Sequence, residues 1–432
     1  MTTRRARSSA SSMIAETIAV GSELLLGGRT DSNSLFITEE LSRLGVEVRF
    51  KSVVGDGQAD IVNALKTAVG RAKVIVMTGG LGPTVDDRTR EAVAQAAGRK
   101  LARRKEAFDG MQARLAQWGR TPNKGQLRQA LIPSGAMVLP NPVGSAPGFW
   151  LAWKGVTLIS LPGVPSEMKT MVRESVVPLL RSQLSKGRST LRPITRLQFH
   201  LWGIPEADAD ARLKGLISKQ DPVDLGLLAS PMGLIVSLTT NTQAHVKGEV
   251  LSSLAQGIRT RLAEWLYGEG DDSMEEVVGR LLTDQKQTIA LAESCTGGLI
   301  GHRLTQVPGS SVYLDRGMIC YSNKAKTDLL GVSPDLIEKH GAVSAEVAAA
   351  MAKGVRERSG VSIGLSVTGI AGPGGATATK PVGLVYVGLD TERGQSITKE
   401  HRFHGDRTVI KQRASQAALD LLRRWLLNKA AP

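Results

Sequence analysis

The sequence predicts an α/β protein with a doubly wound N-terminal domain, a small α+β middle domain and a C-terminal α/β domain. At 432 residues the chain is long enough for two or three domains that each bury a core. Short β-branched runs alternate with amphipathic stretches over 13–185 and again over 271–430, which is typical of sheets covered by helices. Between them, residues 190–268 follow a β-α-β-β-α order.

The N-terminal domain is predicted from strands such as KVIVMTGG and VTLISLPG and from helices such as ADIVNALKTAVGRA and TREAVAQAAG. Their alternation predicts a parallel sheet, in which ligands bind beyond the carboxyl ends of the strands. The preceding residues, 1–12, are basic and rich in serine. We expect a disordered tail there rather than a targeting peptide.

The C-terminal domain is predicted to begin with the helix MEEVVGRLLTDQ and the strand TIALAES. Further strands are expected at SVYLDRGMICYS, SIGLSVTG and GLVYVGL, and VIKQRASQAALDLLRRWLL predicts an amphipathic terminal helix. The middle domain carries no obvious chemical motif, so the candidate sites are expected on either side of it.

Composition narrows the classes of function. Two cysteines argue against a disulfide framework or a Cys-rich zinc site and favour the cytoplasm, and the six histidines show no HExxH spacing. No apolar stretch has transmembrane length, so we expect no membrane partner. The formal charge is +15, but Lys and Arg are spread along the chain and only 4% of residues are aromatic. This favours small anionic substrates such as nucleotides over nucleic acid.

The stretch TGGLGPTVDD follows a predicted strand and precedes a predicted helix. Its glycines, Gly79, Gly80 and Gly82, would let the backbone approach a ligand and offer N–H groups to a phosphate. Asp86 and Asp87 come next, and they would either cap the helix or hold a divalent metal ion bridged to that phosphate.

Two other strand ends of the N-terminal domain carry polar residues. VGSELLLGGRTDSNS contains Asn33, within a DSNS segment suited to a ribose or a phosphate. LPGVPSEMK places Glu167 at the start of a helix, where it would line the same cleft or only complement the helix dipole.

In the C-terminal domain, LAESCTGG places Ser294, Cys295 and Thr296 between a strand and a helix. A nucleophile there would lie near backbone N–H groups around Thr296–Gly298 that could stabilise an oxyanion. A hydroxyl needs a base, and CYSNKAK offers Lys324 and Lys326 at the next strand end. No histidine base is evident for a thiolate, so we expect Cys295 to be a small buried side chain.

Two later loops add candidate binding residues. SVTGIAGPGG contains Thr368 and Gly369, which could contact a phosphate or a carboxamide, and FHGDRTVIKQR contains Arg407, a candidate phosphate clamp.

The motifs VGSELLLG, TGGLGPTVDDRTREAVA, NPVGSAPGF and LPGVPSEMK resemble the N-terminal domain of the CinA family, which is related to the molybdopterin-binding fold. The resemblance covers 15–175 and implies a metal-dependent ADP-ribose pyrophosphatase. It implies that the loop from Gly79 to Thr84 binds phosphate and that Asp86 and Asp87 bind a divalent metal. The chain departs from the commonest pattern at Val85 and Arg88 and at Gly28–Arg29.

The motifs AESCTGG, VPGSS, YSNKAK, GAVS, VTGIAGPGG, KPVG and GDR resemble the C-terminal domain of the same family over 275–425. This resemblance implies a nicotinamide-nucleotide amidohydrolase without a cofactor, which converts nicotinamide mononucleotide (NMN) and water into nicotinate mononucleotide and ammonia. Carried over by position, Ser294 and Lys326 are the reactive pair, with Thr296 as the second candidate nucleophile. Tyr321, Thr368 and Arg407 would bind the nucleotide. Lys324 and Ala378–Thr379 depart from the usual pattern.

Alternatives remain open at this stage. Ser294 could attack the carboxamide itself, or it could position an attacking water molecule. The two activities could coexist on one chain, with NMN and ADP-ribose as substrates, and we expect a homodimer. A different class of function is a non-enzymatic, nucleotide- or DNA-associated protein of competence or damage response, whose DNA affinity would depend steeply on salt.

Overall fold

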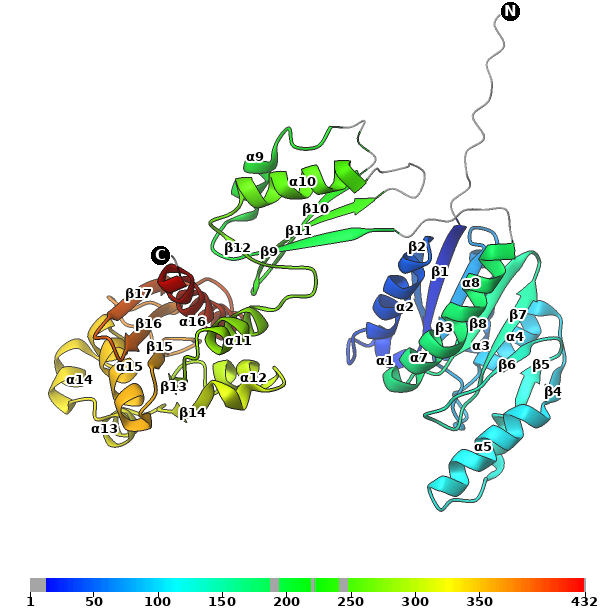
Figure 1. Ribbon diagram of the computed structural model, residues 1–432. Coiled ribbons are helices and arrows are strands. Elements are labelled where there is room, and N and C mark those ends of the chain that lie inside the picture. The colour runs from blue at the N-terminus through cyan, green and yellow to red at the C-terminus, as the bar shows by residue number, and fades with distance from the viewer. Residues whose placement is uncertain (1–12, 187–193, 219–220, 222, 241–247, 431–432) are drawn as a thin grey trace, which may run out of the picture. The chain divides into compact units, whose positions relative to one another are not determined.

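The computed structural model of the chain describes residues 13–186, 194–218, 221, 223–240 and 248–430. The expected tail, 1–12, lies outside these residues. The chain divides into two compact units, one formed by Met1–Arg196 with Thr239–Lys247 and the other by Leu197–Leu238 with Gly248–Pro432 (Figure 1). Among the described helices none is long and apolar enough to cross a membrane.

The first unit is built on a six-stranded sheet with the strand order β2-β1-β3-β8-β7-β6. The first four of these strands run parallel, as the sequence predicts, whereas β7 runs antiparallel to β8 and β6 runs antiparallel to β7. The strands are β1 (Met13–Val20), β2 (Val46–Val54), β3 (Val74–Thr78), β6 (Met137–Leu139), β7 (Gly148–Trp153) and β8 (Val156–Leu161), and β4 (Leu101–Arg103) pairs with β5 (Leu131–Pro133) in a separate ribbon.

A two-residue hairpin loop makes this sheet mixed rather than wholly parallel. Lys154 and Gly155, between β7 and β8, both have positive φ, at 49° and 75°. Two positive φ values in succession are the geometry of a type I′ turn, whose twist matches that of antiparallel strands. The dipeptide Lys-Gly was the available sequence signal for this hairpin.

Helices cover both faces of the sheet. Ile75 and Met77 of β3 pack in one core with α3 and α4, whereas Val74 and Val76 pack in a second core with α2 and α7. This alternation follows from the two-residue period of a strand. The helices are α1 (Ser22–Leu25), α2 (Ser32–Arg43), α3 (Gln58–Val69), α4 (Thr89–Ala97), α5 (Lys105–Gln117), α6 (Lys124–Arg128), α7 (Pro165–Met171) and α8 (Val177–Lys186), with one π-helical turn at Val172–Val176.

The second unit contains the small α+β domain, with a sheet of order β10-β11-β9-β12. The expected β-α-β-β-α order is present, and one short strand, β12, completes it. The elements are β9 (Arg196–Leu201), α9 (Glu206–Leu213), β10 (Val223–Ser230), β11 (Gly233–Thr240), α10 (Gly248–Arg261) and β12 (Leu266–Glu269). Trp202 and Tyr267 of this domain pack against the core of the C-terminal domain.

The C-terminal domain has a five-stranded sheet of order β14-β13-β15-β16-β17, in which β14, β13 and β15 are parallel. Its strands are β13 (Ile289–Glu293), β14 (Leu314–Ile319), β15 (Ile363–Gly369), β16 (Leu384–Thr391) and β17 (Ser396–Arg402). Its helices are α11 (Met274–Asp284), α12 (Leu299–Thr305), α13 (Asn323–Leu330), α14 (Pro334–His340), α15 (Ala345–Ser359) and α16 (Arg407–Ala430), with a 3-10 turn at Ser310–Val312.

The predicted fold class is therefore confirmed, as two α/β domains and a small α+β domain. In each α/β domain the parallel strands lie side by side, so their carboxyl ends meet at one edge of the sheet. The glycine-rich and hydroxyl-rich motifs follow these strand ends, which places each group of motifs together.

Candidate active sites

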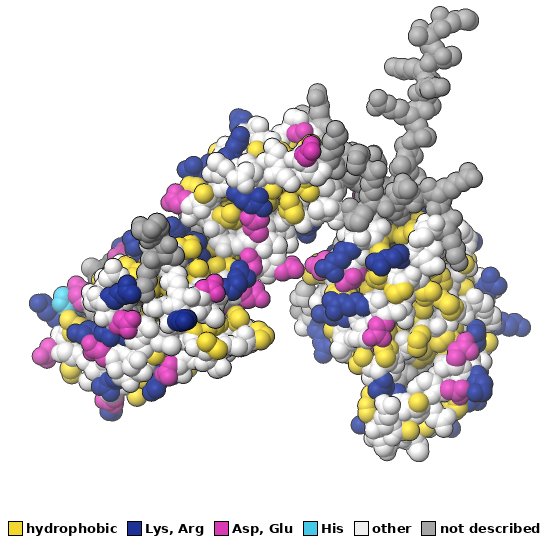
Figure 2. All heavy atoms as spheres, in the orientation of Figure 1, with side chains coloured by type: hydrophobic (Ala, Val, Ile, Leu, Met, Phe, Trp, Pro, Cys, Tyr) yellow, Lys and Arg dark blue, Asp and Glu magenta, His cyan; other side chains and the backbone are white. Residues whose placement is uncertain are grey.

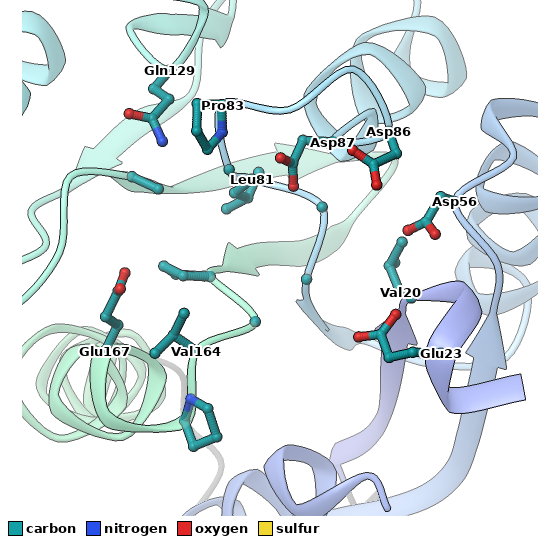
Figure 3. A pocket seen from close by; sticks show the side chains of 18 of the residues that line it. Val20, Glu23, Asp56, Leu81, Pro83, Asp86, Asp87, Gln129, Val164 and Glu167 are labelled. Atoms are coloured by element: carbon teal, nitrogen blue, oxygen red, sulfur yellow. The ribbon is translucent and has the colours of Figure 1, made fainter. Parts of the chain in front are cut away.

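A pocket of about 470 Å³ opens where the turns after β1, β3 and β8 meet (Figure 3). Its wall combines backbone from the glycine-rich turn after β3 with carboxylates from several elements. The charged side chains that line it are five carboxylates and one guanidinium, from Glu23, Asp56, Asp86, Asp87, Glu167 and Arg29. Such a wall suits a metal-bound phosphate better than a free anion.

The turn after β3 requires glycine at its start. Gly79 has φ +104°, and a Cβ there would lie 2.1 Å from the carbonyl oxygen of Val20. Gly80 has φ +67°, and its Cβ would lie 2.2 Å from Thr89 Oγ1. The buried Arg90 holds the rest of the turn by donating to two of its carbonyl oxygens. The backbone is thus fixed close to the pocket, as the motif predicts.

The two aspartates lie at the pocket and do not cap the following helix. The N-cap of α4 is Arg88, which makes no side-chain capping bond, so the capping alternative is wrong. Asp87 Oδ2 instead accepts from the backbone N–H and the hydroxyl of Thr84, at 2.8 and 2.5 Å. Thr84 therefore positions Asp87 and does not itself line the pocket.

The structure tests how well these carboxylates suit a metal ion. Among the described residues no three His, Cys, Asp or Glu side chains are grouped as ligands for one ion. Mg²⁺, however, usually keeps several waters and is held by one or two carboxylates together with substrate phosphates. Asp86 and Asp87, beside a phosphate-sized backbone turn, fit that mode and do not fit a cage made of protein alone.

Asn33 has a different position from the one expected. Its side chain is buried behind the pocket wall, where Nδ2 donates to Thr78 Oγ1 at 2.9 Å and to the carbonyl oxygen of Gly163 at 2.8 Å. Thr78 in turn donates to Pro162. Asn33 thus ties the ends of β3 and β8 together and is not among the residues that line the pocket.

Glu167 lines the pocket and also lies in the first turn of α7, so both interpretations of it hold. Asn141 donates to its Oε2 at 2.7 Å. A Cβ on Gly144 would lie 2.1 Å from the same oxygen, so the 141–144 loop closes tightly around the carboxyl group. Burial raises the pKa of Glu167.

In the C-terminal domain the structure brings Ser294 and Lys326 together. Ser294 follows β13, and Lys326 lies in the first turns of α13, just beyond the neighbouring strand β14. Lys326 Nζ lies 3.2 Å from Ser294 Oγ, 3.0 Å from the carbonyl oxygen of Cys320 and 3.5 Å from that of Tyr321. A lysine on the next strand end can thus serve the hydroxyl as a base.

The two lysines of CYSNKAK have opposite environments. Lys326 is 1% exposed, and burial lowers its pKa because the charged amine loses hydration. Lys324 is exposed and forms an ion pair with Asp328. Burial raises the pKa of Cys295 to about 12, so this thiol stays protonated beside the hydroxyl group of Ser294.

The expected oxyanion site is only partly present, because a buried carboxylate occupies the start of α12. Glu293 accepts from the backbone N–H groups of Gly298, Ile300 and Gly301, at 2.9, 3.1 and 2.8 Å. Gly297 N–H donates to the carbonyl oxygen of Ser294. The expectation that Gly297 and Gly298 hold an oxyanion is therefore wrong.

The Thr296 N–H makes no backbone hydrogen bond within the described part of the chain. Of the three N–H groups expected to stabilise an oxyanion, those of 296–298, it is therefore the one that remains available. Thr296 Oγ1 is buried and likewise has no partner among the described residues.

Of the expected binding residues, Tyr321 and Arg407 lie together. Arg407 Nη2 donates to Tyr321 OH at 2.8 Å, and Nη1 donates to the carbonyl oxygen of Gly372 at 2.8 Å. Thr368 is buried, and its hydroxyl donates to Ala342 at 2.8 Å. Gly369 lies against β16, where a Cβ would be 2.7 Å from Val385 Cγ2. The contacts of Thr368 and Gly369 are thus with the protein itself, and the two residues fix the backbone at the end of β15.

Sequence reasoning missed two charged residues of this site. Glu293 immediately precedes Ser294, and its position before a turn and a helix was a usable signal for a cap. Lys411 lies one helical turn after Arg407, on the same face of α16. A Cβ on Gly297 would lie 3.6 Å from its amino group, so Lys411 places a second cation beside the turn.

Family comparisons match nearly the whole chain. Residues 16–182 match the probable molybdopterin binding domain, 197–268 match the KH domain of the damage-inducible protein CinA, and 271–426 match the CinA C-terminal domain.

KH domains clamp nucleic acid with a G-x-x-G loop. The sequence of 197–268 contains no G-x-x-G.

Relatives named as CinA-like proteins align with this chain over nearly the full length of both sequences. A CinA-like protein of Thermosynechococcus vestitus is 42% identical over 419 residues, which cover 96% of this chain and 99% of that protein. A CinA-like protein of Acidobacterium capsulatum is 42% identical over 423 residues, which cover 96% and 100%. The crystal structure of a competence/damage inducible protein from Agrobacterium tumefaciens is 42% identical over 36% of this chain and 95% of its own, with a TM-score of 0.34. The expected resemblance is confirmed, and the chain belongs to the CinA family.

Proposed function

We propose that the C-terminal domain hydrolyses the carboxamide of NMN to nicotinate mononucleotide and ammonia. The observation that carries the proposal is the buried Ser294–Lys326 pair, with 3.2 Å between Oγ and Nζ. A neutral lysine amine has two N–H donors and one lone pair. The carbonyl oxygens of Cys320 and Tyr321 can accept the two donors, and the lone pair is then left to accept the Ser294 proton.

The proposed reaction proceeds through an acyl-enzyme. Lys326 takes the proton of Ser294 while Oγ attacks the carboxamide carbon, and the Thr296 N–H stabilises the oxyanion. The lysine ammonium then returns the proton to the departing nitrogen, so ammonia leaves. Water attacks the ester next, with Lys326 as its base, and the acid is released as Ser294 regains its proton. In the alternative mechanism Lys326 activates the water directly and Ser294 orients it.

The roles of the other residues follow from their places around the pair. Tyr321 is 59% exposed and is held by Arg407, so it offers a ring surface to the nicotinamide nucleotide. Arg407 and Lys411 supply positive charge for its phosphate. No cofactor enters this proposal.

The test compares two lysines of one helix. Lys326→Met should lower NMN deamidation by a factor of about 100 or more, because it removes the general base. Lys324→Met should leave the rate within about twofold, because this exposed side chain forms only a surface ion pair. Ser294→Ala tests the covalent route, because near-normal turnover of this variant would refute it.

We infer a second activity for the N-terminal domain, the hydrolysis of ADP-ribose to AMP and ribose 5-phosphate. It is supported by the acidic pocket beside the glycine-rich turn. Asp86 and Asp87 would hold a divalent ion that offsets charge on the diphosphate. The backbone of Gly80–Gly82 and the guanidinium of Arg29 would bind phosphate oxygens, because the N–H of Gly79 already donates to the carbonyl oxygen of Leu161. Both activities would then process breakdown products of pyridine dinucleotides.

This second activity has its own test. Release of AMP from ADP-ribose should require a divalent metal and stop with a chelator, while NMN deamidation continues. Asp86→Asn and Asp87→Asn should abolish AMP release, whereas Asp109→Asn should not, because this exposed side chain of α5 does not line the pocket and pairs with Lys105. Turnover of ADP-ribose that a chelator does not affect would exclude this assignment.

A further inference from the structure

Gln129 is a buried polar residue of the N-terminal pocket that the proposed reaction does not use. It lies between α6 and β5, is 1% exposed and lines the pocket of Figure 3. Its Oε1 is buried and has no hydrogen-bond partner among the described residues. An unpaired buried amide oxygen is unfavourable, and native structures rarely keep one without a reason. Because Gln129 also lines the pocket, a ligand that binds there can supply the missing donor.

The backbone around Gln129 is held firmly against the pocket. Gly125 of α6 lies so close to the turn after β3 that a Cβ there would be 2.5 Å from the carbonyl oxygen of Pro83. Arg128, next to Gln129, forms an ion pair of 3.0 Å with Glu91 of α4. The amide is therefore positioned before a ligand binds, which lowers the entropy cost of recognition.

The position of Gln129 separates it from most of the acidic groups. In Figure 3, Gln129 and Glu167 lie on one side of the pocket, and Asp86, Asp56 and Glu23 lie on the other. A metal-bound diphosphate is drawn toward the more acidic side and the glycine-rich backbone. The side with the amide is left for an uncharged part of the nucleotide.

We propose that Gln129 recognises the adenine base of the nucleotide, an inference that rests on the proposed pyrophosphatase activity. Oε1 accepts from the exocyclic amino group, and Nε2 donates to the neighbouring ring nitrogen. A glutamine amide matches this donor–acceptor edge in both groups. A ribose diol would instead pair best with a carboxylate, which the pocket supplies elsewhere. Gln129 thus makes the pocket selective for adenine over bases that carry an oxygen at this position.

The test compares ADP-ribose with inosine diphosphate ribose, in which a carbonyl oxygen replaces the amino group. The full-length protein with Mg²⁺ should prefer ADP-ribose by a factor of about 10 or more in kcat/KM, because a site built for a hydrogen bond rejects a mismatched group. Gln129→Leu should remove this preference by lowering the value for ADP-ribose alone. Gln112→Leu, on the exposed face of α5, should keep it.

Two further measurements separate this inference from the activity on which it rests. Binding of AMP and IMP to the protein with Mg²⁺, measured by calorimetry, should show the same Gln129-dependent preference even if ADP-ribose is not hydrolysed. Hydrolysis of ADP-ribose with a base preference that Gln129→Leu does not change would overturn the inference and leave the activity standing. Binding of neither nucleotide would overturn the inference, whereas the activity is judged by the hydrolysis of ADP-ribose itself.

A stability measurement excludes a structural explanation. Gln129→Leu replaces an unpaired amide with an apolar group of similar size, so its unfolding temperature should be unchanged or higher. A lower unfolding temperature together with unchanged base preference would assign Gln129 to the core and refute its role in recognition.

Discussion

Lys326 shows at the scale of one residue how burial creates reactivity. The same seven-residue stretch contains an exposed lysine in an ion pair and a buried lysine whose pKa is lowered. Burial shifts the pKa of Lys326 toward the range in which an amine can accept a proton at physiological pH. The loss of hydration that disfavours the charged amine is thus the same effect that makes the neutral amine available as a base.

Stability should therefore depend on pH through Lys326. In the unfolded chain this lysine keeps its proton up to about pH 10.4, and in the folded protein it releases it at lower pH. Between the two pKa values the unfolded state binds more protons, so stability rises with pH. The free energy of unfolding of the wild type, relative to Lys326→Met, should increase by up to about 1.4 kcal/mol per pH unit in this window.

Urea unfolding of both proteins at several pH values, up to about pH 10, measures this difference. The same titration should appear in catalysis, where kcat/KM for NMN rises with pH to a plateau as Lys326 loses its proton. Parallel stability profiles for the wild type and Lys326→Met would show that the lysine has an ordinary pKa, and the proposed base would then be wrong.

At the scale of elements, close packing decides which glycines are needed. Gly354 of α15 faces α13, and a Cβ there would lie 2.0 Å from the backbone carbonyl oxygen of Leu330. Gly110 of α5 has nothing within 4 Å of the same position. Both residues lie inside helices, so their sequence context alone does not distinguish them.

Gly354→Ala should lower the free energy of unfolding by about 1–3 kcal/mol, because backbone must move to admit the methyl group. Gly110→Ala should raise it by about 0.5–1 kcal/mol, because alanine reduces the conformational freedom of the unfolded chain. Thermal unfolding of the two variants measures both effects. A similar effect from both substitutions would contradict the packing of α15 against α13.

The β7–β8 hairpin shows where element prediction failed. The alternation of strands and helices predicted a parallel sheet, and four of the six strands obey it. The positive φ values of Lys154 and Gly155 reverse the chain within two residues. Lys-Gly is a weaker hairpin signal than Asn-Gly, and β7 and β8 are both mostly buried, so they lack the polar alternation of a typical hairpin.

At the scale of the whole molecule, the two candidate sites belong to different compact units. A ligand stabilises the unit that binds it, by about 2.7 kcal/mol at a concentration of 100 times Kd. NMN should therefore protect the second unit, and ADP-ribose should protect the first. Stability measured for the intact chain combines both units, so a local measurement is needed.

Hydrogen exchange followed by mass spectrometry provides that measurement. Ser294→Ala with NMN should gain protection around 289–326, and the wild type with Mg²⁺ and AMP, the nucleotide product of ADP-ribose, should gain it around 74–90. Equal protection of both regions by either ligand would show that the two units are coupled. Protection by NMN confined to 74–90 would contradict the assignment of sites.

The sequence by itself determined the fold class, the family and the strand ends that carry chemistry. These follow from periodicity and from motifs of adjacent residues, such as the glycines after β3 and the hydroxyl groups after β13, which local structure keeps together. Ser294 and Lys326 could be named in advance because parallel neighbouring strands end at one edge of a sheet.

The tertiary structure decided which groups are buried and what they contact. It placed Asn33 behind the pocket wall, gave the first N–H groups of α12 to Glu293, and left the amide oxygen of Gln129 without a partner. Burial and hydrogen-bond pairing depend on residues tens of positions away, as with the separation of 45 positions between Asn33 and Thr78. No local pattern records these contacts, because they form only when separate elements pack together.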